Sequence, residues 1–252
     1  MENRIKELTH IIKDSNNIVF FGGAGCSCES GIPDFRSSNG LWNEKLKKNI
    51  TPEQLVSHSF FIKYQEDFFC FYKDKLIYPD AKPNAAHIAL AKLEKMGKLK
   101  AIVTQNIDGL HQAAGSKVVY ELHGSVLRNY CMKCGTFYDV NFILGSKGVP
   151  ICTHCEGTIK PDVVLYEEGL DDNVINGAVD AISKADTLII GGTSLVVYPA
   201  AGLINYFKGN NLILINKSTT AADNKADLII NYDIGKVFNE VMERIENSIP
   251  EH

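Results

Sequence analysis

The chain has 252 residues, of which 45% are hydrophobic, and this is enough to bury a full core in one large domain or in a domain with an insertion. Its formal net charge of −4 and its pI of about 6.0 provide no electrostatic attraction to nucleic acid or anionic membranes, so neither is expected as a partner. No apolar run approaches the roughly 20 residues of a membrane span, and the charged amino-terminal residues are typical of an amphipathic helix rather than a signal peptide. We therefore expect a cytoplasmic protein.

The first distinctive element is an apolar run at residues 18–21 that ends in Gly22-Gly23-Ala24-Gly25. This pattern predicts a buried strand followed by a turn whose glycines let backbone N–H groups approach a ligand closely. Gly23-x-Gly25 begins the dinucleotide-phosphate fingerprint, but Cys-Ser-Cys at 26–28 stands where the third glycine would follow. Taken alone, these residues fit a tight structural turn as well as a nucleotide site.

Short apolar runs recur through the rest of the chain, with helical segments between several of them. Because the runs do not alternate with polar residues, they predict strands that helices cover on both faces. The predicted fold class is therefore α/β, with a doubly wound, Rossmann-type parallel sheet. The expected strands are 18–21, 101–104, 118–122, 187–190, 212–215 and 228–231, and helices are expected at 85–96 and 174–183.

Two stretches fit this alternation poorly. Residues 41–79 are rich in aromatic side chains and are predicted to be helical, and residues 128–161 are short, turn-rich and cysteine-bearing. We expect the helical insertion 41–79 and the cysteine-bearing insertion 128–161 to form a small domain. The Rossmann-type domain would then consist of residues 1–40, 80–127 and 162–252. The spacing of the aromatic residues favours core packing over ligand contact.

Polar residues follow three of the predicted strands. Gln105-Asn106-Ile107-Asp108 comes after the second strand, His123 after the third, and Gly191-Gly192-Thr193-Ser194 after the fourth. Open α/β sheets bind ligands at the carboxyl ends of their strands, and a histidine there is placed for general-base work near neutral pH. Taken alone, a histidine is more often structural. Asn216, which follows the predicted strand 212–215, fits a ribose contact and a turn residue equally well. The clusters together nevertheless indicate a site.

The cysteine spacing predicts a metal site. Cys131-x2-Cys134 and Cys152-x2-Cys155 are two knuckles separated by a loop, and each presents two thiolates on one side. Four thiolates leave no open position, so the expected zinc ion is structural. The chain has seven cysteines, and an odd number argues against a disulfide framework. The two pairs therefore favour metal binding.

The chain resembles the sirtuins, a family of NAD-dependent protein lysine deacylases, over nearly its whole length. The resemblance rests on the two cysteine knuckles and on five motifs: GAGCSCESGIPDFR (23–36), TQNIDGLHQAAG (104–115), ELHGS (121–125), KPDVVLYEEGL (160–170) and GTSLVVYPAAGL (192–203). It implies that NAD and an acyl-lysine peptide enter from opposite sides of a cleft between the Rossmann-type domain and the small domain.

The resemblance also assigns roles to residues. His123 would be the catalytic base, and Asn106 would orient a water or a ribose hydroxyl. The peptide would lie extended between residues 163–166 and 194–197, against Val163, Val164, Tyr166 and Val196. The cofactors would be NAD and one structural Zn²⁺, with the zinc on Cys131, Cys134, Cys152 and Cys155. The NAD contacts would come from Gly23, Ala24, Gly25, Cys28, Asp34, Phe35, Arg36, Gln105, Ile107, Asp108, Gly192, Thr193, Ser194, Asn216 and Asp233.

The reaction that the resemblance implies transfers the acyl group of acetyl-lysine to ADP-ribose, with release of nicotinamide, O-acetyl-ADP-ribose and free lysine. The partners would be acyl-lysine proteins, and we expect a monomer. Two other classes stay open on the sequence, a mono-ADP-ribosyltransferase and a non-enzymatic NAD-sensing or scaffold module. An ordinary dehydrogenase is disfavoured because it would leave the zinc ribbon unexplained.

Three departures from the family pattern stand out. Cys26 and Cys28 replace an aliphatic and a small or hydroxyl residue, which raises the hypothesis of an oxidisable thiol beside the cofactor. Glu167 adds a carboxylate near the expected peptide groove and would favour basic residues beside the target lysine. Finally, residues 69–72 contain no arginine to pair an acidic acyl group, which favours neutral acyl groups, acetyl first.

Overall fold

The structure is a computed structural model, and it describes residues 1–34 and 50–248. Phe35 and Arg36 of the expected site, and the first nine residues of the expected helical insertion, lie outside the described residues. Among those that are described, no helix is both long enough and apolar enough to cross a membrane.

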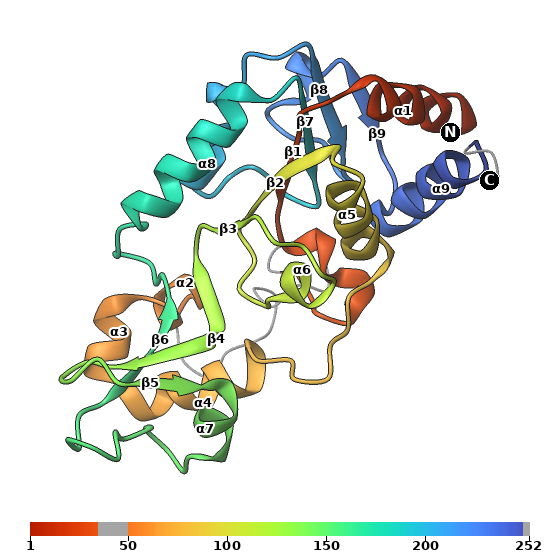
Figure 1. Ribbon diagram of the computed structural model, residues 1–252. Coiled ribbons are helices and arrows are strands. Elements are labelled where there is room, and N and C mark those ends of the chain that lie inside the picture. Colours follow the sequence, from red (N-terminus) through yellow and green to blue (C-terminus); the bar gives the residue numbers. More distant parts are fainter. Residues whose placement is uncertain (35–49, 249–252) are drawn as a thin grey trace.

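A six-stranded sheet with the order β3-β2-β1-β7-β8-β9 forms the larger part of the molecule, and each pair of neighbouring strands is parallel (Figure 1). The order runs outward from β1 on both sides, as in a doubly wound sheet. The prediction of a Rossmann-type parallel sheet is confirmed, and each strand coincides with one of the six apolar runs. The strands are β1 Ile18–Gly22, β2 Leu99–Thr104, β3 Val119–Glu121, β7 Thr187–Gly191, β8 Asn211–Ile215 and β9 Leu228–Ile230.

Helices cover both faces of this sheet, which explains why its strands are apolar throughout. α1 (Glu2–Asp14), α5 (Ala85–Lys95) and α9 (Ile234–Glu246) lie on one face, and α8 (Asp172–Lys184) lies on the other (Figure 1). Strand β1 divides its side chains between the two cores: Phe20 packs in the cluster of α1, α5 and α9, while Phe21 packs in the cluster of α8. Both rings are completely buried.

The glycine turn after β1 continues as two short 3₁₀-helices, Ala24–Cys26 and Cys28–Ser30, and not as a long α-helix. Side-chain caps define the helices that follow. Asn84 caps α5 by accepting a hydrogen bond from Ala86 N–H, and Asp171 accepts from Asn173 and Val174 at the start of α8. Further 3₁₀-helices span Ala200–Tyr206 and Asp223–Lys225, and a short α-helix, α6, spans Leu110–Ala113.

A smaller lobe lies below the sheet in Figure 1. Its antiparallel sheet has the order β5-β4-β6, with β4 Gly124–Cys131, β5 Phe137–Asp139 and β6 Ile159–Val163. Its helices are α2 Pro52–Leu55, α3 His58–Lys63, α4 Gln65–Lys75 and α7 Val140–Gly145. Phe61, Phe68, Phe69 and Tyr72 are completely buried in its core, with Phe68 stacked on Tyr72 at a centroid distance of 5.5 Å. These aromatic residues therefore pack as the sequence analysis expected.

Strands β4 and β6 run across the predicted domain boundaries and connect the smaller lobe to the main sheet. Arg128 on β4 joins the two parts electrostatically. Its Nη1 lies 2.7 Å from Glu121 Oε2 at the end of β3, and its Nε lies 2.7 Å from Asp162 Oδ2 on β6. The position of β4 relative to the main sheet matters for function because His123 immediately precedes this strand.

Candidate active site and metal centre

The residues expected to form the site gather at the carboxyl ends of the main sheet. Each strand contributes the residues that follow it: the glycine turn follows β1, Gln105 follows β2, His123 follows β3 and the turn at 191–194 follows β7. Asn216 directly follows β8, and Asp233 comes shortly after β9. Because the strands are parallel neighbours, residues more than 200 positions apart in the chain share one edge of the sheet.

Two glycine turns face each other in backbone contact. Gly25 N–H donates to the carbonyl of Gly192 at 2.8 Å, and Gly23 N–H donates to the carbonyl of Gly191 at 3.3 Å. A Cβ on Gly25 would lie 2.8 Å from Gly192 Cα, and one on Gly192 would lie 2.4 Å from Cys26 N. Side chains are therefore excluded here, and the turns form a cradle that fits the phosphates of a dinucleotide such as NAD.

Thr193 is held from three sides at the centre of this cradle. The amide of Asn216 clasps its backbone, accepting from Thr193 N–H at 3.0 Å and donating to Thr193 C=O at 2.9 Å. Gln105 Nε2 donates to Thr193 Oγ1 at 3.0 Å. Asn216 thus positions the second turn from within the protein, and this clasp leaves the exposed Ser194 next to the open side of the cradle.

Ser27 belongs to the candidate site, although the sequence did not single it out. Its hydroxyl donates to Asp108 Oδ2 at 2.7 Å and accepts from Asn106 Nδ2 at 3.0 Å, and its side chain is buried. It therefore fixes Asn106 and Asp108, two residues of the expected site, relative to the glycine turn. Asp108 Oδ1 also accepts from Leu110 N–H at 2.9 Å. The only signal in the sequence was a hydroxyl residue two positions after Gly23-Ala24-Gly25.

His123 is arranged as a neutral base. Its Nδ1 lies 3.0 Å from the carbonyl oxygen of Gln105, so Nδ1 carries the proton and donates to that oxygen. Burial lowers the pKa of His123 from its ordinary value of 6.5, and this outweighs the hydrogen bond to Gln105, which raises it. Within the described residues no protein group bonds Nε2, so the lone pair on Nε2 is available to accept a proton.

The two cysteines of the glycine turn differ in environment. Cys26 is buried in the core of the main sheet and donates to Gly191 C=O at 3.3 Å, and burial raises the pKa of its thiol to about 12. It therefore takes the packing role of an aliphatic residue and is a poor redox centre. Cys28 lies at the surface, and partial burial of its thiol, together with the nearby charge of Asp34, raises its pKa as well.

Charged residues surround the far end of the cradle. Asp233 pairs with Lys217 at 2.5 Å and with Lys236 at 3.2 Å, and these contacts lower its pKa. Glu29, which follows the glycine turn, accepts a hydrogen bond from Gly235 N–H in the first turn of α9 at 2.9 Å. This contact fixes α9 against the turn and is favourable beside the positive end of the helix dipole.

The residues expected to contact the peptide flank the base. Val164 N–H donates to the carbonyl of His123 at 3.0 Å, which places the segment after β6 beside this histidine. Tyr166 and Val196 are exposed, with 38% and 54% of their surfaces accessible, whereas Val163 is buried. Among the described residues, no hydrogen bond engages the backbone carbonyls of Val164 and Val196, so both segments retain groups that an added strand could pair with.

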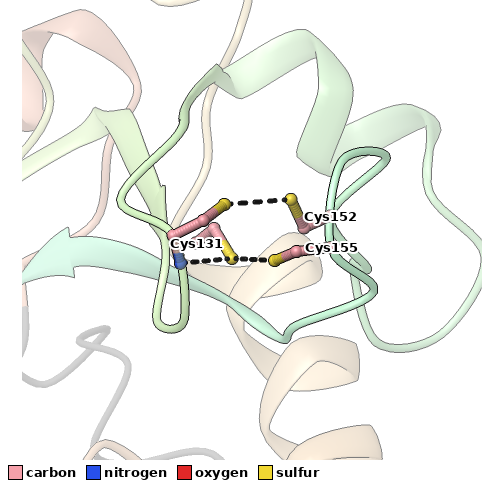
Figure 2. Close-up of side chains that lie close together, drawn as sticks. Cys131, Cys152 and Cys155 are labelled. Carbon is pink, nitrogen blue, oxygen red and sulfur yellow. Dashed lines mark hydrogen bonds between the residues drawn. The ribbon is translucent and has the colours of Figure 1, made fainter.

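The four cysteines of the two knuckles form a separate centre in the smaller lobe. Their sulfur atoms all lie within 4.8 Å of one another, with 3.4 Å between Cys131 and Cys155 and 3.6 Å between Cys134 and Cys152. A tetrahedral zinc ion with bonds of about 2.3 Å separates its sulfur ligands by about 3.8 Å, so the cluster fits zinc closely. Figure 2 shows Cys131, Cys152 and Cys155 directed toward one another from facing loops.

The knuckle backbones suit thiolate ligands. Backbone N–H groups of Lys133 and Cys134 donate to Cys131 Sγ, and His154 N–H donates to Cys152 Sγ. Gly135 adopts a left-handed conformation with φ of 71° after the first knuckle, and Glu156 adopts one with φ of 60° after the second. Gly157 is required there for space, because a Cβ would lie 3.0 Å from Cys131 Sγ.

Comparison with known proteins gives consistent matches. The Sir2 family matches residues 23–199 of the chain. An NAD-dependent protein deacetylase from Clostridium perfringens is 76% identical over 96% of this chain and 100% of its own length, and one from Staphylococcus aureus is 46% identical over 96% and 99%. A solved Sir2 structure with a p53 peptide and NAD⁺ has a TM-score of 0.85 and 39% identity, covering 97% of this chain and 99% of its own. A Sir2 bound to an acetylated peptide has a TM-score of 0.84 and 40% identity over the same shares.

Proposed function

The chain belongs to the Sir2 family, and we propose that it removes acetyl groups from protein lysine side chains in an NAD-dependent reaction with His123 as the base. The products are nicotinamide, O-acetyl-ADP-ribose and free lysine. The observation that carries the assignment of the base is the hydrogen bond from His123 Nδ1 to Gln105 C=O, which fixes the neutral tautomer and leaves the lone pair on Nε2 to accept a proton. Mono-ADP-ribosyl transfer is not favoured, because the curated relatives are named as deacetylases.

The residues of this chain divide the work. NAD, when bound, supplies the ribose carbon that accepts the acyl oxygen and nicotinamide as the leaving group. Asn106 and Asp108, held by Ser27, orient the nicotinamide end, and the glycine turns at 23–25 and 191–194 hold the phosphates. His123 Nε2 takes a proton from a ribose hydroxyl, and the carbonyl of Gln105 stabilises the imidazolium that results.

The zinc site has a structural part in this scheme. Four cysteine ligands leave no position for a reacting group, so the ion would hold the two knuckles together. The knuckles close the end of the sheet formed by β4 and β6, and these strands support His123 and the segment 163–166. Loss of the ion would therefore disturb the peptide side of the site without touching the reacting atoms.

The remaining functional assignments are also proposals. We infer a Rossmann-type domain of residues 1–40, 80–127 and 162–252 and a small domain of 41–79 and 128–161, with the reaction in the cleft between them. A monomer suffices, because one chain supplies every proposed site residue. The net charge of −4 disfavours nucleic acid and anionic membranes as partners. None of the cysteines in the described part of the chain forms a disulfide, which suits the reducing cytoplasm.

A panel of acylated peptides tests the proposal. Peptides that differ only in the lysine modification (acetyl, propionyl, succinyl, or none) are incubated with NAD, and O-acyl-ADP-ribose is measured by mass spectrometry. The acetyl peptide is expected to give the product and the unmodified peptide none. Nicotinamide release that is independent of any acyl peptide would refute the deacetylase assignment, and ADP-ribose attached to a peptide would indicate the transferase instead.

A further inference from the structure

We propose that Glu167 is a positioning residue for the peptide, because its carboxylate bridges the peptide-binding segment 163–166 to helix α3. This inference rests on the proposed function, since it assumes that the segment holds an acyl-lysine peptide.

The backbone of the segment is already attached to the smaller lobe on one edge. Tyr166 N–H donates to Val56 C=O at 3.0 Å, and His58 N–H donates to Tyr166 C=O at 3.0 Å, so residue 166 forms an isolated parallel bridge with Ser57. The opposite edge of the segment must remain open for the peptide to add as a strand. One bridged residue does not fix the orientation of the whole segment. The side chains that follow Tyr166 must therefore contribute to that orientation.

Glu167 supplies the next attachment. Its Oε2 accepts hydrogen bonds from Ser59 N–H at 2.9 Å and from Ser59 Oγ at 2.5 Å, although the two residues are 108 positions apart. These contacts lower the pKa of the Glu167 carboxyl, so it is ionised at neutral pH. The carboxylate that the sequence analysis expected to attract basic peptide residues is thus engaged with α3.

Glu168 closes the same turn from the other side. Its carboxylate accepts from Leu165 N–H at 2.9 Å, contacts His58 Nδ1 at 2.8 Å and lies 3.1 Å from Lys160 Nζ. The first two residues of α3, His58 and Ser59, therefore contact one carboxylate each. Both acidic residues of the turn after Tyr166 are thus bonded to this helix.

The backbone conformation of Glu167 supports a functional role for this bridge. Its φ of 76° lies in the left-handed region, which glycine adopts freely and a glutamate adopts at a cost. Such conformations persist where surrounding contacts hold them, and they cluster at functional sites. Here the two hydrogen bonds to Ser59 hold a conformation that a glycine would reach without them.

The test is a double-mutant cycle between Glu167 and Ser59, read as steady-state kinetics with an acetyl-lysine peptide. Glu167→Ala is expected to raise the KM for the peptide about five- to tenfold, because a charge-assisted bond is lost, while the KM for NAD and kcat change less than about twofold. Ser59→Ala is expected to give a smaller increase, since its backbone N–H remains. The double variant is expected to match Glu167→Ala alone, as two partners in one contact should.

Matched variants separate the contact from general effects. Glu66→Ala removes the same charge from an exposed position in the same lobe and is expected to leave the peptide KM unchanged. Glu167→Gln keeps an acceptor for Ser59 and is expected to restore part of the affinity, and it serves if the alanine variant does not fold. A peptide KM within twofold of wild type in Glu167→Ala, or effects that add in the double variant, would overturn the inference. If the wild-type protein itself makes no O-acetyl-ADP-ribose, that result refutes the proposed deacetylase function. It is therefore distinct from the results that refute the role of Glu167.

Discussion

Ser27→Ala tests the assembly of the cofactor pocket most sharply, because it removes one oxygen atom from a buried position. The hydroxyl bonds Asp108 at 2.7 Å and Asn106 at 3.0 Å, and the residue is only 1% exposed. A hydrogen bond to a charged group contributes about 1.5–3 kcal/mol and a neutral one about 0.5–1.5 kcal/mol. Loss of both bonds is expected to lower the free energy of unfolding by about 2–4 kcal/mol. The hydrogen bond from Leu110 N–H to Asp108 remains in the variant.

The same change should reduce catalysis, since Asn106 and Asp108 lose the contact that fixes them to the glycine turn. We expect kcat/KM for NAD to fall about 10- to 100-fold, each factor of ten corresponding to about 1.4 kcal/mol. Urea unfolding and initial rates of nicotinamide release measure the two effects. Ser183→Ala on α8, far from the site, is the control and should change stability by less than about 0.5 kcal/mol. If Ser27→Ala behaves like this control, the reasoning about the pocket is wrong.

Three further predictions follow from the geometry. Burial lowers the pKa of His123 below 6.5, so the neutral base is lost only as the pH falls through that lowered value. The measured kcat/KM should therefore stay level from about pH 8 to about 6.5. A midpoint of the pH profile above 6.5 would contradict this expectation. Zinc removal by chelation, or Cys152→Ser, should lower the melting temperature and abolish peptide deacetylation, and an unchanged melting temperature after verified metal loss would contradict a structural zinc. Glu29→Ala removes the acceptor for Gly235 N–H and should cost about 1 kcal/mol, or about 2–4 °C, so an unaltered melting temperature would count against that contact.

Much of the fold could be predicted from local patterns. Each of the six apolar runs forms a strand of the parallel sheet, because a strand buried on both faces must be apolar along its whole length. The cysteine knuckles were equally readable, since two residues between thiolates is the spacing that a zinc turn requires. The resemblance to sirtuins then identified the family, and the comparisons confirm it.

The contacts between distant residues could not be predicted in the same way. Ser27 meets Asp108 across 81 positions, and Glu167 meets Ser59 across 108, so neither pair leaves a local signal. The amide of Asn216 clasps the backbone of Thr193, because the ends of β7 and β8 lie side by side. Periodicity identifies the strand that carries a residue, but the direction of its side chain depends on which strands become neighbours.

The central claim is that His123 is the base of a deacetylation reaction, and one measurement tests it most directly. O-acetyl-ADP-ribose is quantified by mass spectrometry after wild-type protein and the His123→Ala variant are each incubated with NAD and an acetyl-lysine peptide. The wild type should form the product, and the variant should form it at least about 100-fold more slowly, the usual loss when a general base is removed, while still binding NAD. Product formation by His123→Ala at the wild-type rate would contradict the account.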